Sequence, residues 1–119
     1  MTKIRINNAK FYAYHGVLDY EKEYGNEFEI DIEMNCDLND LKMSDRLENT
    51  VDYLSVYKLT EKIFTSHKFN LIETANEAIG TEILNNFEKI DSVTVKIRKP
   101  NAPLGIIDSV EIEKTYYRN

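Results

Sequence analysis

Four short polar segments of this chain carry side chains that could perform acid–base chemistry or hold a small polar ligand. They contribute carboxylates, a phenol and a lysine ammonium group, which are groups that enzymes use to move protons. Each segment lies where one element of secondary structure is expected to end or the next to begin, and functional residues are concentrated at such junctions. The segments are residues 14–21, 50–53, 70–73 and 98–103.

Each of these side chains also has an ordinary structural explanation. Glu73 follows Asn70 by three residues and could complete a capping box at the start of a helix. Lys99 and Glu21 could simply be solvated, as most lysines and carboxylates are. Tyr53 could pack against the start of a helix with its hydroxyl in water. Composition and periodicity alone therefore leave the role of the four segments open.

Other common chemistries fit the sequence poorly. A catalytic zinc site normally takes three protein ligands, and the chain has two histidines, His15 and His67, far apart in the sequence. His67 is expected near a helix end, where an imidazole facing the helix dipole is the ordinary explanation. The sequence contains no glycine-rich phosphate loop and no nucleophile elbow. Cys36 belongs to an apolar series on a strand, which argues against a nucleophilic cysteine.

Size and charge restrict the expected partners. With 119 residues, 42% of them hydrophobic and 30% charged, the chain is expected to form one soluble domain over residues 1–119. A domain of this size has no deep interdomain cleft, so a sizeable pocket must be shallow or completed by another subunit. The net charge of −6 argues against nucleic acid and against an anionic membrane as partner. No apolar run approaches the roughly 20 residues of a membrane span, and no secretory signal is seen, so a cytoplasmic protein is expected.

The first elements that must position the polar segments are two strands. Residues 27–38 alternate apolar and polar side chains, a pattern typical of a strand with one buried face. Residues 3–14 predict a second, less regular strand before it. A polar loop of about a dozen residues, containing Gly16 and Gly25, connects the two, and ordered loops of that length are often functional.

Two helices and two further strands complete the expected fold. Apolar residues recur at helical spacing over residues 56–64 and 72–83, and they alternate again over residues 93–97 and 110–113. The order β-β-α-α-β-β predicts an α+β domain, in which an antiparallel four-stranded sheet carries two helices on one face. The edges of such a sheet expose unpaired backbone groups, and pairing between subunits is one way to satisfy them.

The order and spacing of the polar segments resemble one known family. The residues concerned are Tyr14-His15-Gly16 followed by Glu21, then Thr50-Val51-Asp52-Tyr53, Asn70-Leu71-Ile72-Glu73 and Lys99-Pro100-Asn101-Ala102-Pro103. Together they resemble dihydroneopterin aldolases from about residue 3 to residue 115. Ala75 and the run 105–108 depart from the expected pattern, and neither lies in the segments that carry the resemblance.

The resemblance implies the tunnelling fold, whose element order is the one expected above. Its subunits join their sheets into a ring of four, two rings usually stack into an octamer, and the active sites lie between adjacent subunits. It also implies that a dihydropterin is the substrate and that neither a cofactor nor a metal is needed. A 7,8-dihydropterin carries a ring C=N bond that can accept the electrons released by retro-aldol cleavage, so only acid–base steps remain for the protein.

The resemblance further implies roles for individual residues. Glu73 would hold the amino group and neighbouring N–H of the pterin ring, with backbone groups of Ile72 on the same edge. Lys99 would transfer the proton beside the trihydroxypropyl side chain, Glu21 would bind its hydroxyls and orient Lys99, and Tyr53 would act in reprotonation. The implied catalytic residues are Lys99, Tyr53 and Glu21, and the implied substrate-binding residues are Glu73, Ile72, Val51, Asp52 and Leu71, with no metal ligand.

Two alternatives share the resemblance. A dihydroneopterin-triphosphate epimerase would need clustered cations for the phosphates, and Arg98 and Lys99 are the clear candidates here. A non-catalytic pterin-binding ring would have no use for Glu21, Tyr53 and Lys99 together. A pyruvoyl-tetrahydropterin-synthase-like activity depends on a zinc bound by histidines, which the two distant histidines do not favour.

Overall fold

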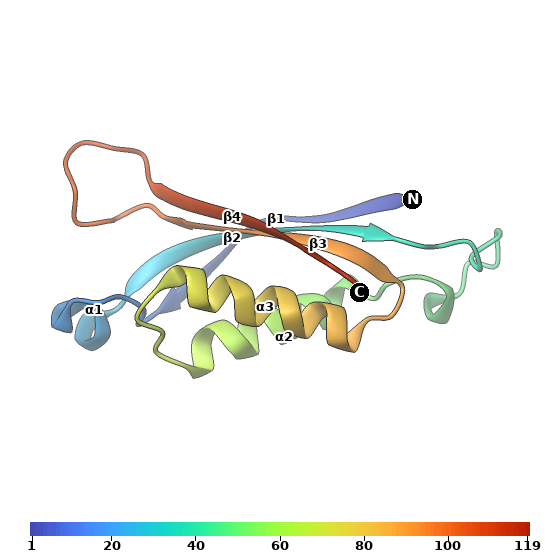
Figure 1. The fold of residues 1–119 in the computed structure, drawn as a ribbon, viewed down its shortest axis with the longest axis horizontal. Coiled ribbons are helices and arrows are strands. Elements are labelled where there is room, and N and C mark those ends of the chain that lie inside the picture. Colours follow the sequence, from blue (N-terminus) through green and yellow to red (C-terminus); the bar gives the residue numbers. More distant parts are fainter.

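A computed structural model describes all residues, 1–119, and shows one antiparallel sheet with helices on a single face (Figure 1). The sheet has four strands in the order β1-β2-β3-β4, so β1 and β4 form its edges. The strands are β1 (Thr2–Ala13), β2 (Asn26–Cys36), β3 (Ile90–Lys99) and β4 (Val110–Tyr117), and the helices are α1 (Asp19–Tyr24), the 3₁₀ turn η1 (Leu47–Asn49), α2 (Tyr53–Ser66) and α3 (Ile72–Asn86). The predicted α+β tunnelling fold is confirmed in its element order and its antiparallel sheet.

The alternating pattern of β2 places one row of its side chains in the core. Phe28, Ile30, Met34 and Cys36 are fully buried there, while the intervening acidic residues face solvent. The same face of β3 contributes Val93, Val95 and Ile97, as expected for a central strand with one covered face. Cys36 is therefore the small core residue that its position in the apolar series predicted.

Helices α2 and α3 lie side by side beneath this face of the sheet (Figure 1). Their buried side chains recur every three or four residues, as an amphipathic helix requires. The α2 helix begins with Asp52, whose Oδ1 accepts a hydrogen bond from the Leu54 N–H at 3.1 Å and whose Oδ2 accepts from the Ser55 hydroxyl at 3.0 Å. Neither main helix has the length and apolar character of a membrane-spanning segment.

Two local predictions were wrong. The connection between β1 and β2 is not simply a loop, because residues 19–24 form the short helix α1. The capping box expected from Asn70 and Glu73 does not form, since α3 begins one residue later, with Leu71 at its N-cap and no side-chain cap. Glu73 is thus left without the reciprocal partner that the pattern suggested.

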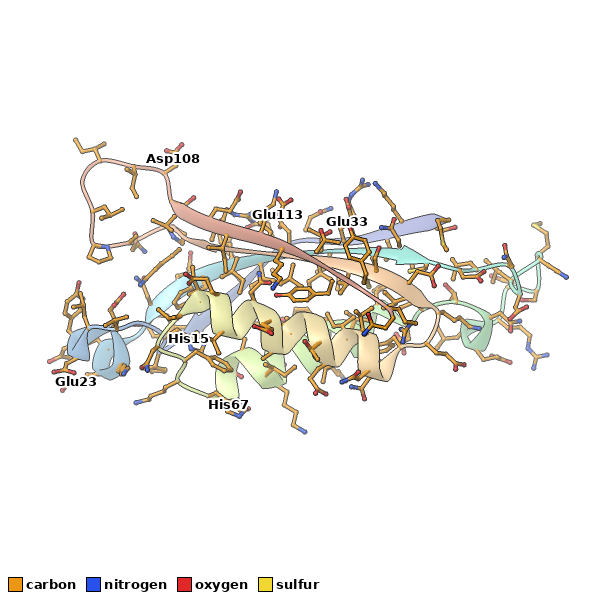
Figure 2. All side chains as sticks on the ribbon, viewed as in Figure 1. His15, Glu23, Glu33, His67, Asp108 and Glu113 are labelled. Carbon is orange, nitrogen blue, oxygen red and sulfur yellow. The ribbon has the colours of Figure 1, made fainter.

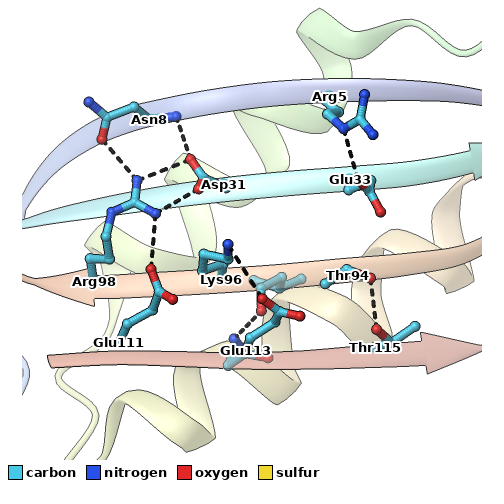
Figure 3. A network of polar contacts seen from close by, with 12 residues as sticks. Arg5, Asn8, Asp31, Glu33, Thr94, Lys96, Arg98, Glu111, Glu113 and Thr115 are labelled. Atoms are coloured by element: carbon cyan, nitrogen blue, oxygen red, sulfur yellow. Dashed lines mark hydrogen bonds and ion pairs between the residues drawn. The ribbon is translucent and has the colours of Figure 1, made fainter.

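The helix-free face of the sheet is charged, with Glu33 and Glu113 projecting from the side opposite the helices (Figure 2). Arg98 is its most connected residue: it donates to Asp31 Oδ2 at 2.6 Å and also contacts Glu111 (Figure 3). It donates to Glu29 Oε1 at 3.0 Å as well. Hydrogen bonds from Arg98 hold the pKa of Asp31 below its usual value. Arg98 therefore binds β2, β3 and β4 together on the face away from the helices.

A bulge in β1 joins the edge strand to the same network. The register with β2 shifts between Ile6 and Ala9, and Asn8 has a positive φ of 56°. In this conformation the Asn8 N–H donates to Asp31 Oδ1 at 2.6 Å, and Asn8 Oδ1 accepts from Arg98 at 3.0 Å (Figure 3). An Asn at positive φ is among the least costly non-glycine choices, and here both its backbone and its side chain are used.

Candidate active site

A cavity of about 350 Å³ opens at the end of the molecule where α1 and the β3–β4 loop lie (Figure 1). Three of the four polar segments meet there: the loop after β1, the start of α3, and the end of β3 with the loop that follows. Its volume is within the range of small-molecule sites. The lining residues are Gly16, Val17, Leu18, Glu21, Asn70, Leu71, Ile72, Glu73, Lys99, Ala102, Pro103, Leu104, Val110 and Ile112.

Glu21 and Lys99 form an ion pair in the wall of this cavity. The Lys99 ammonium donates to Glu21 Oε2, and the two side chains are only 12% and 6% exposed for Lys99 and Glu21, respectively. The ordinary explanation that both are merely solvated is therefore wrong. Glu21 reaches Lys99 from α1 and Lys99 is the last residue of β3, so helix and strand hold the two sides of the pair.

The electrostatics of Glu21 favour its ionised form. Burial by itself would raise the pKa of its carboxyl, but hydrogen bonds from Lys99 and from the backbone of Leu18 and Val17 outweigh it and lower the pKa. The Leu18 N–H donates to Glu21 Oε1 at 3.2 Å. Gly16 has a φ of 149°, and a Cβ there would lie 2.4 Å from the Glu21 carboxylate. A glycine at position 16 thus allows the carboxylate to pack against the backbone.

Glu73 offers the cavity a carboxylate with no partner. It is exposed on the first turn of α3 and makes no hydrogen bond or ion pair within the chain. The first N–H groups of a helix have no intrahelical acceptor, so the backbone of Ile72 and Glu73 presents donors beside this acceptor. The combination can bind a planar ligand edge that both donates and accepts hydrogen bonds.

His15 is fully buried behind the cavity, between the sheet and the helices (Figure 2). Its Nδ1 accepts a hydrogen bond from the Phe69 N–H at 3.0 Å, which leaves the proton on Nε2, and Nε2 donates to the Phe64 carbonyl at 2.7 Å. Burial lowers the pKa of His15, the bond to Phe64 opposes that effect, and the nearby His67 and Lys99 lower the pKa further. The imidazole is therefore neutral, with both nitrogens occupied.

The remaining polar segment, residues 50–53, lies elsewhere in the molecule. Val51 and Asp52 line a second cavity, of about 420 Å³, beside η1 and the end of α3. Tyr53 begins α2 with 64% of its surface exposed. The 14 residues of α2 separate Tyr53 from the first cavity by roughly 20 Å, at 1.5 Å per residue. The fold thus brings Glu21, Leu71, Ile72, Glu73 and Lys99 together and places Val51, Asp52 and Tyr53 at the opposite end.

Val51 and Asp52 have structural roles within their own chain. Val51 is 3% exposed and belongs to the core, and both carboxylate oxygens of Asp52 cap α2. No group of three or more His, Cys, Asp or Glu side chains is arranged to hold a metal ion. His67 lies at the end of α2, where its Nδ1 contacts the Ile63 carbonyl at 3.2 Å, as its position near a helix end suggested.

Sequence reasoning missed the apolar part of the cavity wall. Leu18, Leu104, Val110 and Ile112 line it, and only the alternation around Val110 gave any sign of a face. Leu104 is 65% exposed, in a loop whose neighbours carry no periodic pattern. Their role depends on how the β3–β4 connection folds over the end of α3, which no local pattern reports.

A family model for dihydroneopterin aldolase matches residues 4–115, nearly the whole chain. The chain belongs to the dihydroneopterin aldolase family. Membership makes it an aldehyde-lyase of folate biosynthesis, in agreement with the resemblance found in the sequence.

Individual relatives and solved structures agree with this family. The dihydroneopterin aldolase of Bacillus subtilis (strain 168) is 34% identical over 116 residues, which cover 97% of this chain and 97% of that protein. The crystal structure of E. coli dihydroneopterin aldolase in complex with neopterin has a TM-score of 0.90 at 22% identity and covers 98% of this chain and 99% of that one. A dihydroneopterin aldolase from Burkholderia thailendensis bound to guanine has a TM-score of 0.86 at 20% identity, with 99% and 92% covered. At these identities the two structures establish the shared fold.

Proposed function

We propose that 7,8-dihydroneopterin binds in the 350 Å³ cavity and is cleaved there to 6-hydroxymethyl-7,8-dihydropterin and glycolaldehyde. The observation that carries this proposal is the pairing of Glu21 with Lys99 in the same cavity wall as the unpartnered Glu73. A proton-transfer group and a ring anchor are the two functions that this reaction requires of a protein. In this proposal Lys99 with Glu21 supplies the proton transfer, and Glu73 supplies the ring anchor.

Glu73 is the proposed ring anchor. The ligands named for the E. coli and Burkholderia structures, neopterin and guanine, share an amino-oxo-pyrimidine edge. That edge presents an amino group beside a ring N–H, which matches the two oxygens of one carboxylate. The free N–H groups at the start of α3, with Ile72 and Leu71 around them, can serve the acceptors of the same edge.

Lys99 and Glu21 are the proposed proton-transfer pair. Removal of the proton from the 2′-hydroxyl lets its oxygen form the aldehyde as the bond between the first and second side-chain carbons breaks. The released electron pair moves into the ring C=N bond and gives an enamine, and glycolaldehyde leaves. Protonation of the first side-chain carbon then restores the C=N bond and yields the hydroxymethyl product. Lys99 handles the proton, and Glu21 orients Lys99 and binds the side-chain hydroxyls.

The site is completed by a second copy of the chain in this proposal. Tyr53 lies too far from Lys99 within one chain to act on the same substrate, since α2 separates them by roughly 20 Å. The open edges of β1 and β4 can pair between copies, and a closed ring satisfies both edges at once. We assign Val51, Asp52 and Tyr53 to the site of the neighbouring subunit, in a ring of four or two stacked rings.

The triphosphate epimerase is less well supported. Its phosphates would need clustered cations, and Arg98, one of two candidates, projects from the helix-free face into ion pairs with Asp31 and Glu111 (Figure 3). Arg98 also forms an ion pair with Glu29. Lys99 is then the one basic side chain in the cavity wall of a single chain. A neutral trihydroxypropyl side chain fits such a wall better than a triphosphate does.

The test is anaerobic incubation with 7,8-dihydroneopterin in EDTA, with the products separated by chromatography. Hydroxymethyl-dihydropterin and glycolaldehyde are expected, and Lys99→Ala should lose about 10²–10⁴-fold in turnover. Return of the substrate only as its epimer would make epimerisation the main activity. Bound but unconverted pterin would instead favour a binding protein, and a fully active Lys99→Ala variant would remove Lys99 from the mechanism.

The shared site has its own test, in which Lys99→Ala and Tyr53→Ala chains are co-expressed and purified as mixed assemblies. If the two residues come from different copies, about a quarter of the sites regain both side chains in a random mixture. If both act from one chain, every site in the mixture lacks one of them and activity stays at the level of the parent variants.

A further inference from the structure

We propose that His15 is a positioning residue that fixes the Glu21–Lys99 pair relative to Glu73 on the other side of the cavity. The proposal rests on the proposed roles of Glu21, Lys99 and Glu73. His15 itself does not line the cavity, so it acts on the reaction through its neighbours. His15 belongs to the segment Tyr14-His15-Gly16, which carries part of the family resemblance, and it has no role in the mechanism proposed above.

The contacts of His15 connect two segments far apart in the sequence. Its Nδ1 accepts from the Phe69 N–H at 3.0 Å, and the next residue, Gly16, donates its own N–H to the Phe69 carbonyl at 3.0 Å. Both backbone groups of Phe69 are thus held by two consecutive residues. The second ring nitrogen, Nε2, donates to the Phe64 carbonyl at 2.7 Å and holds the end of α2.

Each partner leads directly to one wall of the cavity. Phe69 is followed by the segment 70–73, which contains Glu73. Gly16 lies against the Glu21 carboxylate, so close that a Cβ at position 16 would lie 2.4 Å from it. Glu21 in turn binds Lys99. The Nδ1 bond to Phe69, beside the bond from the Gly16 N–H to the Phe69 carbonyl, therefore links the segment that carries Glu73 to the Glu21–Lys99 pair.

Packing makes the orientation of the imidazole specific. His15 is fully buried, and its ring centroid lies 4.3 Å from that of Phe64 and 5.3 Å from that of Phe69. Phe28 closes a third side at 5.5 Å. A small apolar residue would fill part of this space, but it would leave the Phe69 N–H and the Phe64 carbonyl without partners. Both bonds require a neutral ring with its proton on Nε2.

The test separates the two bonds with a matched pair of variants. In His15→Asn, the amide oxygen stands near the position of Nδ1 and can keep the bond to Phe69, whereas the bond to Phe64 is lost. In His15→Gln, the amide nitrogen stands near the position of Nε2 and can keep the bond to Phe64, whereas the bond to Phe69 is lost. Both variants remove the same aromatic ring, so their thermal stabilities should fall by similar amounts.

Single-turnover rates and pterin dissociation constants, the latter from pterin fluorescence, are then compared with those of the wild type. We expect His15→Gln to lower the rate by about 10- to 100-fold, because an offset near 1 Å between reacting groups has that effect. Its dissociation constant should stay within about threefold, since α3 still carries Glu73, and His15→Asn should keep most of the rate. Equal loss of rate in the two variants would overturn the proposal and reduce His15 to a packing residue.

A second pair of variants tests the hydrogen bond between the Phe69 N–H and His15 Nδ1 by changing Phe69. Phe69→Leu keeps the backbone donor and Phe69→Pro eliminates it, while both delete the phenyl ring, so the Pro variant should show the additional loss of rate. In the wild type, ¹⁵N NMR of the two histidines should report a neutral His15 with the proton on Nε2. A proton on Nδ1 would contradict the geometry. A fully active Lys99→Ala variant would refute the proposed mechanism itself, and that result is distinct from equal rates in the two His15 variants.

Discussion

The ion pair between Glu21 and Lys99 makes the sharpest prediction, because it is both nearly buried and proposed to be functional. The perturbation is a double-mutant cycle with Glu21→Gln, Lys99→Met and the combined variant. Each single change leaves the other charge in a wall where the side chains are 12% and 6% exposed. Removing one partner of a buried pair typically costs about 3–5 kcal/mol, and one side of this pair faces a cavity that water can enter, so we expect about 3 kcal/mol for each single variant.

The coupling between the two residues should be about 2 kcal/mol, the usual contribution of a hydrogen bond between charged groups. The double variant should therefore be destabilised by less than the sum of the two single variants. For a chain of this size, about 3 kcal/mol corresponds to a decrease in Tm of roughly 10 °C. The assay is thermal and urea unfolding at one fixed protein concentration, because the proposed assembly would make Tm depend on concentration.

Turnover should behave differently from stability in the same cycle. Each single variant should lose about 10²–10⁴-fold in rate, and the double variant should show no recovery of rate, because it still lacks the lysine that transfers the proton. Glu23→Gln is the matched control, since Glu23 lies exposed on the same short helix (Figure 2) and makes no ion pair. Stability effects of Glu21→Gln and Lys99→Met that add within about 0.5 kcal/mol would refute the coupling.

Three further predictions concern residues beside the cavity and in the core. Gly16→Ala should destabilise the protein by about 1–3 kcal/mol and reduce turnover, because its Cβ would lie 2.4 Å from the Glu21 carboxylate; calorimetry and the aldolase assay check both, and an unchanged rate would contradict the contact. Tyr116→Phe should cost about 1–3 kcal/mol in urea unfolding, because the Tyr116 hydroxyl donates to the buried Asn76 Oδ1 at 2.6 Å, whereas the exposed Tyr117→Phe should be neutral. Stability should fall as pH drops below 6.5, because the unfolded chain then takes up a proton at His15. The folded chain, in which the pKa of His15 is lowered, takes up that proton only at lower pH. The His15→Asn variant should lack this part of the pH dependence of stability, and a profile identical to that of the wild type would exclude His15 as its source.

The sequence could predict those parts of the fold that repeat at short range. The alternation in β2 and the helical spacing in α2 and α3 depend on neighbours within a few residues, and both predictions are confirmed. The helix α1 was missed because six residues, mostly polar, carry no apolar period. The capping box failed because Leu71, whose side chain cannot cap, stands at the N-cap and moves the start of α3 by one residue.

The site was accessible to sequence reasoning only through the resemblance. Glu21 and Lys99 are 78 residues apart, and their contact requires α1 to lie against the end of β3. The bonds of His15 to Phe64 and Phe69 span 49 and 54 residues. Such contacts depend on the three-dimensional path of the chain, and the types of the residues alone do not specify them. The buried state of Glu21 and Lys99, two residues usually solvated, is the clearest instance.

The length of α2 has a thermodynamic consequence. Tyr53 and Lys99 lie at opposite ends of the molecule, so in the proposed shared site a pterin would contact two copies at once, and its binding free energy would also stabilise their association. Substrate at 100 times its dissociation constant would favour the assembled form by about 2.7 kcal/mol per site. Under the proposed ring arrangement, assembly and ligand occupancy would be linked equilibria: dilution should weaken pterin binding, and saturating pterin should favour the assembled form at protein concentrations where the free protein would dissociate.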